Sequence, residues 1–291
     1  MFEFVCLEGN TYCFKSMANV GIYEKGDGSV ILIDSCEHVR MVRSIDRYLR
    51  DKNLTIDTII STHCHVDHIC GNRFFQDKFG CKILSTETEK AFIAVPDLEP
   101  SFYYAGIDTD KTRNPFFMIE PSTAETITEE NTPDGFEIIS LPGHSFDMIG
   151  VRTPDDIVFL ADSIISEQTW QIHRMPFFHN VNESIETLKM LKTLKAKWFV
   201  PSHDKPLTDI SELADYNIER LLDLKERAYR LCDGKSFDEF FKALLEDLEL
   251  KIRTEKYPSY AVMGRNILQA LVEDDRVCAV LEDNIFVWHR K

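Results

Sequence analysis

The sequence lacks the features that would assign it to a membrane or a secretory pathway. Its 291 residues contain no apolar run near the roughly 18 residues that a membrane-spanning helix needs. The N-terminus begins Met1-Phe2-Glu3, with an acid in place of the basic start of a secretory signal. We therefore expect a cytoplasmic protein without a membrane partner.

Cysteine motifs and nucleophile motifs are also missing. The 8 cysteines form no CxxC pair, which disfavours a zinc ribbon, and a chain of this length needs no disulfide framework. We expect most of these cysteines to be small buried apolar residues in a reducing compartment. No GxSxG motif is present, so the sequence offers no serine nucleophile of that kind.

Positive charge is scarce. Lys and Arg number 33 against 49 Asp and Glu, which gives a net charge of −16. Nucleic-acid binding needs a basic surface, so this balance disfavours a nucleic-acid partner. Bound metal ions would add local positive charge, so a polyanionic partner is disfavoured but not excluded. With 44% hydrophobic residues the chain can bury the sizeable core of a globular protein.

Strand and helix patterns alternate over residues 1–206 and predict a mixed α/β domain. Apolar alternation predicts strands at 11–15, 20–24, 29–35, 56–60, 82–85, 136–141, 148–152, 157–160 and 197–200. Helical periodicity predicts helices at 37–52, 71–79, 86–95 and 182–194. Residues 97–133 are irregular and rich in aromatic residues. They form either a long loop anchored to the domain or an apolar lid over a functional site.

The sequence pattern of residues 207–291 predicts a separate, mainly helical appendage. Helices are expected at 209–231, 236–248 and 260–273, followed by a hairpin of strands 277–281 and 285–288. Three helices and a hairpin are typical of a winged-helix-like unit, whose tempting function is DNA binding. However, the second helix ends in Glu246-Asp247-Leu248-Glu249, and the hairpin turn carries two acids. This charge favours packing or homodimerisation as the role of the appendage.

The most informative segment is Thr62–His68, in which three histidines and an aspartate follow an apolar strand. Imidazole and carboxylate are ligands that zinc and similar divalent metals prefer. His63 and His65 can face one metal, while Asp67 and His68, beyond the bend, can face a second. We interpret Cys64 as a spacer whose side chain points away from the metal.

Three further candidate ligands follow predicted strands. His144 lies in Leu-Pro-Gly-His-Ser, Asp162 in Phe-Leu-Ala-Asp-Ser, and His203 in Val-Pro-Ser-His. Loops that follow strands gather at one edge of a sheet, so these side chains are expected to meet the first cluster there.

With these motifs the chain resembles the metallo-β-lactamase superfamily over roughly residues 1–206. The HxHxDH signature is present as His63-Cys64-His65-Val66-Asp67-His68, and the later His, Asp and His follow in the order of that family. A strand that ends in an aspartate also matches, at Asp34. The resemblance implies an αβ/βα four-layer sandwich, in which two sheets are flanked by helices and the site lies at one edge.

The resemblance also implies a ligand set for two metal ions. His63, His65 and His144 correspond to the ligands of the first metal, Asp67, His68 and His203 to those of the second, and Asp162 to the bridge between them. An aspartate at the bridging position is similar to the hydroxyacylglutathione hydrolase and ribonuclease Z branches. Zinc β-lactamases of the commonest type have cysteine there, so lactam hydrolysis is disfavoured. Asp34 is expected to orient ligands through hydrogen bonds.

This ligand set predicts hydrolytic chemistry. Metal coordination lowers the pKa of bound water from about 15.7 to near 7, so metal-bound hydroxide would be the nucleophile. Asp67 is the candidate catalytic residue, which would orient the attacking oxygen or take its proton. Zinc is the default metal, and His and Asp ligation also suits iron or manganese.

Our first hypothesis for the function is a binuclear metallo-hydrolase of a small organic ester or thioester. The alternatives are a metal-dependent nuclease or phosphodiesterase, an iron-containing redox protein, and a metal-dependent regulatory protein. Residues after Asp162 either pack the following helix or line the substrate pocket. In the second case His173 or Arg174 would hold an anionic group of the substrate. The residues considered there, with two from the irregular segment, are Trp170, His173, Arg174, Pro176, Phe177, Phe178, His179, Tyr103 and Phe116.

Overall fold

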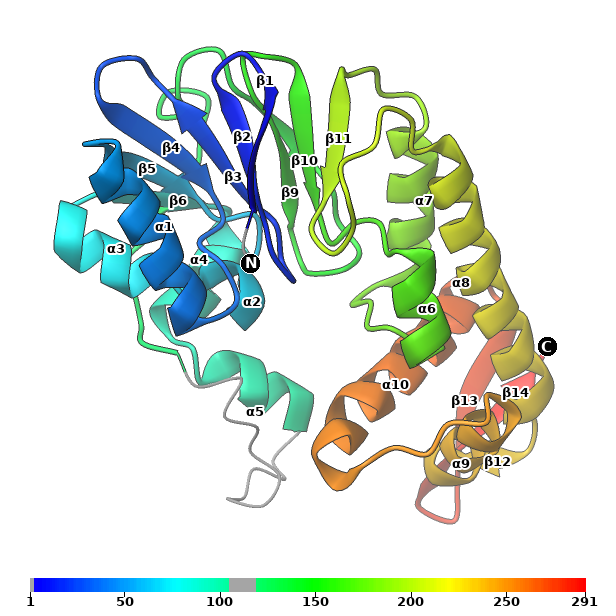
Figure 1. The fold of residues 1–291 in the computed structure, drawn as a ribbon. Helices are drawn as coiled ribbons and strands as arrows, with labels where there is room; N and C mark the ends of the chain where they lie inside the picture. The colour runs from blue at the N-terminus through cyan, green and yellow to red at the C-terminus, as the bar shows by residue number, and fades with distance from the viewer. Residues whose placement is uncertain (1–2, 105–118) are drawn as a thin grey trace.

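Two β-sheets face each other in the computed structural model, which describes residues 3–104 and 119–291 (Figure 1). The first sheet has seven strands in chain order, antiparallel up to β4 and parallel from β4 to β7. They are β1 (Glu3–Glu8), β2 (Thr11–Lys15), β3 (Val20–Glu24), β4 (Ser29–Ile33), β5 (Thr55–Ile60), β6 (Lys82–Ser85) and β7 (Glu125–Thr126). The second sheet has the order β11 (Trp198–Pro201), β10 (Ile157–Ala161), β9 (Ile149–Arg152) and β8 (Glu137–Ser140).

Apolar side chains fill the space between the two sheets and the space between each sheet and its outer helices. Ile33 and Ile60 from the first sheet meet Val151 and Phe159 from the second in one buried cluster. The outer face of the first sheet is covered by α1 (Val39–Asp51) and α3 (Asn72–Phe79), and the second sheet packs on α7 (Val181–Leu191). The predicted four-layer α/β sandwich is therefore confirmed. The central strands β4 and β10 are buried on both faces, which is why their sequences are near-continuous apolar runs.

The C-terminal region contains the predicted three helices and hairpin. Its elements are α8 (Ser211–Cys232), β12 (Lys235–Ser236), α9 (Phe237–Asp247), a 3₁₀ turn (Thr254–Lys256), α10 (Tyr257–Glu273), β13 (Val277–Glu282) and β14 (Ile285–Arg290). The three strands form a small sheet in the order β12-β14-β13. Helix α10 begins three residues before its predicted start, because Pro258 lies in its first turn, where its missing N–H breaks no helical hydrogen bond.

Packing joins this region to the sandwich. Leu188 of α7 belongs to the same buried cluster as Leu221 of α8 and Leu271 of α10. Asn217, fully buried on α8, accepts hydrogen bonds from Ile165 N–H (3.0 Å) and Trp170 Nε1–H (2.9 Å). Its amide also donates to the Ile165 carbonyl at 2.8 Å. The packing role predicted for the appendage is thus observed, whereas dimerisation and the boundary at residue 206 stay predictions.

Several short elements differ from the sequence-based expectation. The segment 97–133, expected as an anchored loop or a lid, contains a helix, α5 (Leu98–Tyr104), and β7, and its residues 105–118 lie outside the described part of the chain. Two further short helices were missed, α2 (Val66–Ile69) and α6 (Glu167–His173), and so was the edge strand β1. The two helices span only 4 and 7 residues and β1 is only partly buried, so none of the three carries a clear amphipathic pattern.

The hypothesis of an aromatic lid involves residues that the structure does not cover fully. Phe116 lies outside the described residues, and the Tyr103 side chain is likewise not described. Among the residues that are described, no helix combines the length and apolar character needed to cross a membrane.

Candidate metal centre

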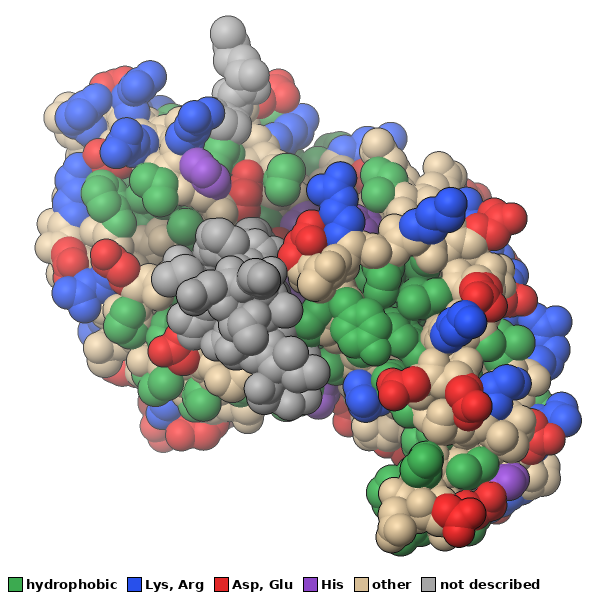
Figure 2. Space-filling view, turned by 90° about the horizontal axis from the view of Figure 1, so that it is seen from below, with side chains coloured by type: hydrophobic (Ala, Val, Ile, Leu, Met, Phe, Trp, Pro, Cys, Tyr) green, Lys and Arg blue, Asp and Glu red, His purple; other side chains and the backbone are tan. Residues whose placement is uncertain are grey.

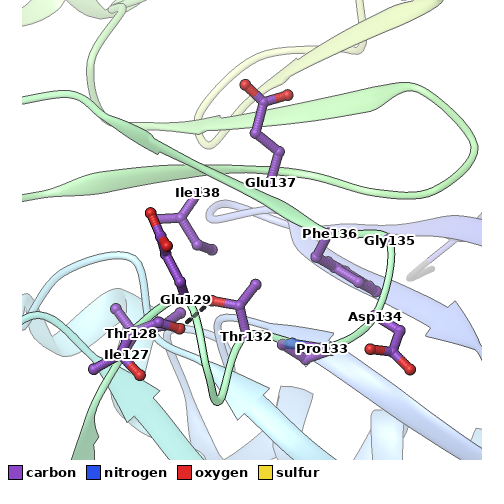
Figure 3. A pocket seen from close by; sticks show the side chains of 10 residues that line it. All are labelled: Ile127, Thr128, Glu129, Thr132, Pro133, Asp134, Gly135, Phe136, Glu137 and Ile138. Carbon is purple, nitrogen blue, oxygen red and sulfur yellow. Dashed lines mark hydrogen bonds between the residues drawn. The ribbon is translucent and has the colours of Figure 1, made fainter.

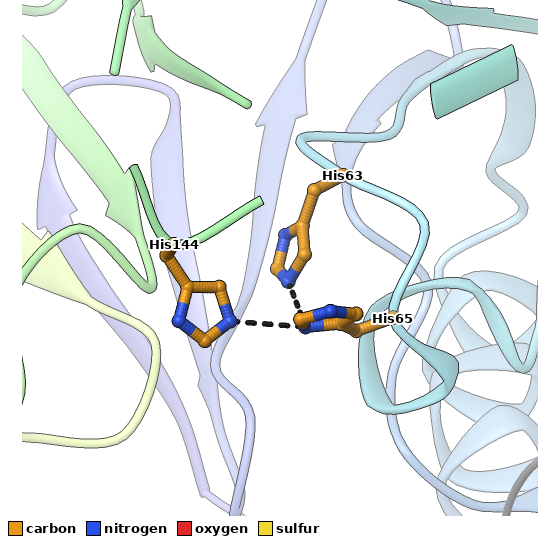
Figure 4. A group of neighbouring side chains, drawn as sticks. All are labelled: His63, His65 and His144. Atoms are coloured by element: carbon orange, nitrogen blue, oxygen red, sulfur yellow. Dashed lines mark hydrogen bonds between the residues drawn. The ribbon is translucent and has the colours of Figure 1, made fainter. Parts of the chain in front are cut away.

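His63, His65 and His144 converge at the edge of the sandwich (Figure 4). The first two follow β5, and His144 lies in the loop between β8 and β9. His65 Nδ1 lies 3.1 Å from His63 Nε2 and 2.9 Å from His144 Nε2. One proton on His65 Nδ1 can serve only one of these two contacts, whereas a cation among the three nitrogens would be coordinated by all of them.

Burial keeps this histidine group uncharged. It lowers the pKa of His63 well below its ordinary value, and the neighbouring His68 and His65 lower it further. Burial also lowers the pKa of His144, and burial together with His144 lowers that of His65 to about 3. Neutral imidazoles with converging ring nitrogens are the form that binds a divalent metal.

Four residues make a second group, Asp67, His68, Asp162 and His203. His203 Nε2 lies 3.3 Å from Asp67 Oδ2 and 3.2 Å from Asp162 Oδ2. His68 Nε2 and Asp162 Oδ1 are 3.4 Å apart, and among the described residues both are buried atoms without a hydrogen-bond partner. Buried polar atoms are rarely left unpaired, so these two orphaned atoms fit a metal ligand set.

The charges of the second group also fit a cation. Burial opposes ionisation of His203, but the carboxylates of Asp162 and Asp67 outweigh it and raise its pKa to about 11. Burial likewise disfavours the charged form of Asp67, yet His68 and His203 bring the pKa of this carboxyl down to about 2. The two carboxylates thus stabilise positive charge at this place. A divalent cation would therefore compete with the imidazole protons for the ligand atoms of this group.

Asp162 lies between the two groups. It directly follows β10, and its Oδ2 is 3.4 Å from His144 Nε2 of the first group and 3.2 Å from His203 Nε2 of the second. Its Oδ1 faces His68. The Asp162 carboxylate thus lies within 3.4 Å of ligand atoms of both groups.

Hydrogen bonds to Asp34 orient two of the histidines. The Thr62 hydroxyl donates to Asp34 Oδ2 at 2.9 Å and therefore accepts from His63 Nδ1–H at 3.1 Å. His68 Nδ1–H donates to the same Asp34 oxygen at 2.7 Å. Both rings consequently present Nε2 to the centre, which agrees with the role expected for Asp34.

Backbone carbonyls orient two more rings. His144 Nδ1–H donates to the Phe177 carbonyl at 3.1 Å, and His203 Nδ1–H donates to the Met17 carbonyl. Their Nε2 atoms are thereby left to face the centre. His65 alone presents Nδ1, so all five imidazoles offer one inward nitrogen each.

Sequence reasoning missed Glu89, which connects the two ligand-bearing loops. This buried residue on α4 (Glu87–Ala94) accepts from the Cys64 N–H at 2.9 Å and from the Ser145 hydroxyl at 2.6 Å. Cys64 lies between His63 and His65, and Ser145 follows His144. Glu87, two residues earlier, is exposed, and nothing in the sequence distinguishes the two glutamates.

We expect Glu89→Ala to weaken metal binding, because both ligand loops lose their shared anchor. Changes to residues that orient metal ligands typically lower metal affinity by about 10–100-fold. Competition with a metal chelator measures that affinity. Glu89→Gln keeps an acceptor for the Cys64 N–H and should retain more of it. Glu87→Gln, on the exposed face of the same helix, is the control, and equal affinities for all the variants would contradict this role.

Two cavities adjoin the centre. One of about 220 Å³ is lined by His144, Asp162 and His203 together with the C-terminal Tyr260. The other, of about 930 Å³, reaches Asp67 and shares His203 with the first. A separate cavity of about 670 Å³ is lined by residues 127–138, without 130 and 131, and shares no residue with the centre (Figure 3).

The other candidate residues after Asp162 differ in what they contact around the metal centre. His173 lines both adjoining cavities, whereas Arg174 is engaged elsewhere, with Glu249 (3.0 Å) and the Leu248 carbonyl (2.7 Å). The ring of His179 packs beside the ring of Phe146, with 4.2 Å between the two ring centroids. Neither His173 nor His179 joins either ligand group.

Cys64 is buried away from the ligand groups, and the aromatic candidates divide between the smaller cavity and the core. Cys64 is buried in an apolar cluster with Ile69 and Ile93 and is in neither ligand group, which agrees with its interpretation as a spacer. Pro176 and Phe177 line the smaller cavity, whereas Trp170 and Phe178 are buried in the core.

The chain matches a known protein family. The family model described as the metallo-beta-lactamase superfamily matches residues 14–203. Among curated proteins, a hydroxyacylglutathione hydrolase of Prochlorococcus marinus is 25% identical over 236 residues, covering 80% of this chain and 83% of that protein. A second one, from Pelagibacter ubique, is 28% identical over 155 residues, covering 53% of this chain and 54% of its own length.

Solved structures share the fold over nearly the whole chain. A beta-lactamase domain protein from Burkholderia ambifaria has a TM-score of 0.74 at 15% identity and covers 99% of this chain and 94% of its own. A metallo-beta-lactamase family protein from Thermus thermophilus has a TM-score of 0.70 at 18% identity and covers 94% of both chains. The C-terminal helices therefore belong to the shared architecture.

Proposed function

This chain belongs to the metallo-beta-lactamase superfamily, and from that premise we propose that it is a binuclear metal-dependent hydrolase of a small organic thioester or ester. The observation that carries the proposal is the Asp162 carboxylate, whose oxygens face ligand atoms of both groups. That the chain is a metallo-hydrolase follows from the family itself. The number of metal ions, their identity and the substrate are the parts we propose.

Seven residues of this chain would hold the metal ions. His63, His65 and His144 offer three neutral nitrogens, which suit zinc, and the second group adds oxygen ligands that also suit iron or manganese. When bound, such ions lower the pKa of a coordinated water to near 7 and polarise the substrate carbonyl. The ligand set proposed here is His63, His65, Asp67, His68, His144, Asp162 and His203.

The surrounding residues of the chain support a small organic substrate. Met175, Pro176 and Phe177 form apolar walls beside His144 and can exclude water from an acyl group. The volume of about 220 Å³ suits a small molecule better than a polymer. Asp67 lines the neighbouring cavity and can orient the attacking water or accept its proton, so it is the proposed catalytic residue.

Thioesters are the preferred class among small substrates. The curated relatives are hydroxyacylglutathione hydrolases, whose name describes hydrolysis of an acylated thiol. The aspartate at position 162 provides a carboxylate at the place that would be thiolate in a cysteine-containing site. We therefore rank thioesters first, other esters second and lactams last.

Metal removal tests the proposal directly. We expect the zinc-loaded protein to contain two metal ions per chain by elemental analysis and to cleave a thioester. Dialysis against a chelator should abolish turnover, and added zinc, iron or manganese should restore it. A phosphodiester and a lactam tested in parallel separate the other hydrolytic activities. Thioester turnover that persists without metal, or cleavage of the phosphodiester alone, would refute the proposal.

A further inference from the structure

A buried glutamate lies beside the first ligand group. Glu99 belongs to α5, is 6% exposed, and places its Oε1 atom 4.0 Å from His65 Nε2. His65 presents its other nitrogen, Nδ1, to His63 and His144. Glu99 therefore faces the side of the His65 ring that points away from the centre. An imidazole N–H and a carboxyl oxygen are a donor and an acceptor that can form a hydrogen bond.

The other four imidazoles of the proposed centre each donate their outward N–H to an oxygen atom of the protein. These acceptors are side chains for two rings and backbone carbonyls for the other two. Such a partner fixes the tautomer of a metal-bound ring and raises the basicity of the nitrogen that binds the metal. Glu99 holds the corresponding position beside His65, the fifth ring.

The Glu99 carboxyl has an acceptor to offer. Among the residues that the structure describes, no group donates a hydrogen bond to it, and His65 is the only basic side chain within 4.0 Å. Buried polar groups are rarely left unpaired. The distance of 4.0 Å exceeds a hydrogen bond by about 1 Å, a gap that rotation of the glutamate side chain closes. Either protonation state of the carboxyl offers an acceptor oxygen, so the contact does not depend on its charge.

Aromatic packing fixes the helix that carries Glu99. Phe102 lies three residues later and therefore on the same face of α5. Its ring centroid is 5.6 Å from that of Phe146 and 5.8 Å from that of His179. Phe146 lies two residues after His144, and the His179 backbone N–H donates to the His144 carbonyl at 3.3 Å. Helix α5 is thus anchored beside the loop that carries one ligand of the first group.

The C-terminal region adds apolar cover near α5. Helix α10 contacts α5, so the two halves of the chain meet at this side of the molecule. Figure 2, viewed from the side on which α5 lies, shows hydrophobic side chains gathered on the half that carries the C-terminal helices. An apolar environment limits the competition of water and strengthens a hydrogen bond.

We infer that Glu99 is the positioning residue of His65, which accepts a hydrogen bond from the Nε2–H of this ring so that Nδ1 faces the first metal. This inference rests on the metal centre of the proposed function and adds one residue to its support. Glu99 acts through His65 and contacts neither metal nor substrate. Helix α5 thereby becomes part of the metal site, although it lies outside both ligand-bearing loops.

Histidine ¹⁵N NMR of the zinc-loaded protein tests the hydrogen bond. His65 is recognised by its zinc-bound Nδ1, because the other four rings present Nε2. We expect its Nε2–H signal at low field in the wild type and in Glu99→Gln, which keeps an acceptor oxygen. In Glu99→Leu, of similar size and without an acceptor, this signal should move upfield or vanish through exchange with water. Ser101→Ala, on the exposed side of α5, is the control and should leave it unchanged.

Competition with a chelator gives a second readout. Glu99→Leu should lower zinc affinity about 10–100-fold, as is typical of residues that orient metal ligands. Glu99→Gln and Ser101→Ala should stay close to the wild type. An unmoved His65 signal in Glu99→Leu, or equal losses of affinity in Glu99→Leu and Glu99→Gln, would overturn the inference. A merely structural role would disturb the signals of all five rings and would count against it as well.

Failure of the proposed function has a different signature. Neither measurement needs a substrate, so a protein that binds zinc and cleaves no thioester would refute the proposed hydrolysis while the two readouts still decide on Glu99. A protein that binds no zinc at all would refute both.

Discussion

Asp162→Ala is expected to abolish hydrolysis and to lower the bound metal below two ions per chain. The carboxylate faces ligand atoms of both groups, so its removal disrupts both proposed sites at once. Metal ions supply several kcal/mol of charge stabilisation to the reaction, so turnover should fall on the order of a thousandfold or more. Thioester kinetics and elemental analysis of the purified variant measure the two effects.

His65→Ala should have a similar effect on turnover, since His65 Nδ1 is the atom that both other histidines of the first group face. Asp134→Ala, an exposed aspartate in the loop before β8, is the matched control and should behave as the wild type. Thermal unfolding checks that each variant keeps its fold. A folded Asp162→Ala protein with near-normal turnover and two metal ions would disprove the ligand assignment.

Asn217→Ala should destabilise the whole chain and not the C-terminal region alone. The substitution leaves the Ile165 N–H, the Ile165 carbonyl and the Trp170 indole N–H without their partner in a buried place. Each unsatisfied buried group costs roughly 1–3 kcal/mol, so we expect a loss of about 3 kcal/mol or more in the free energy of unfolding. Urea denaturation, followed by tryptophan fluorescence and by circular dichroism, measures it.

Glu219→Ala, on the exposed face of the same helix, is the control for Asn217 and should change stability little. A single shifted transition in the Asn217 variant would agree with the continuous buried cluster from α7 to α10. Two separate transitions, with only the second shifted, would instead favour independent folding of residues 1–206 and 207–291.

The long elements were predictable because their sequences carry strong periodic patterns. The strands at 11–15, 20–24 and 82–85 have the predicted bounds, and the C-terminal helices and hairpin lie within a few residues of theirs. Short elements were not predictable in the same way. Helix α6 has one buried residue, Trp170, and its position depends on contacts with α8 that lie far along the chain.

The ligand candidates were recognisable from the sequence, because histidines and aspartates that closely follow apolar strands are typical of a site at the edge of a sheet. His63, His144 and Asp162 illustrate this, and the structure brings them together as expected. Their geometry was not recognisable. Which nitrogen each ring presents depends on partners such as the Phe177 carbonyl, and no local pattern encodes that pairing.

The amino-acid sequence alone therefore determined the family, the α/β class and the set of metal-ligand candidates, because these depend on residue type and local spacing. Only the tertiary structure decided that Glu89 joins the two ligand loops, that Arg174 is engaged with Glu249, and that Glu99 lies beside His65. Such relations join residues far apart in the chain. They arise from packing, where burial and hydrogen bonding select one partner among many chemically equal side chains.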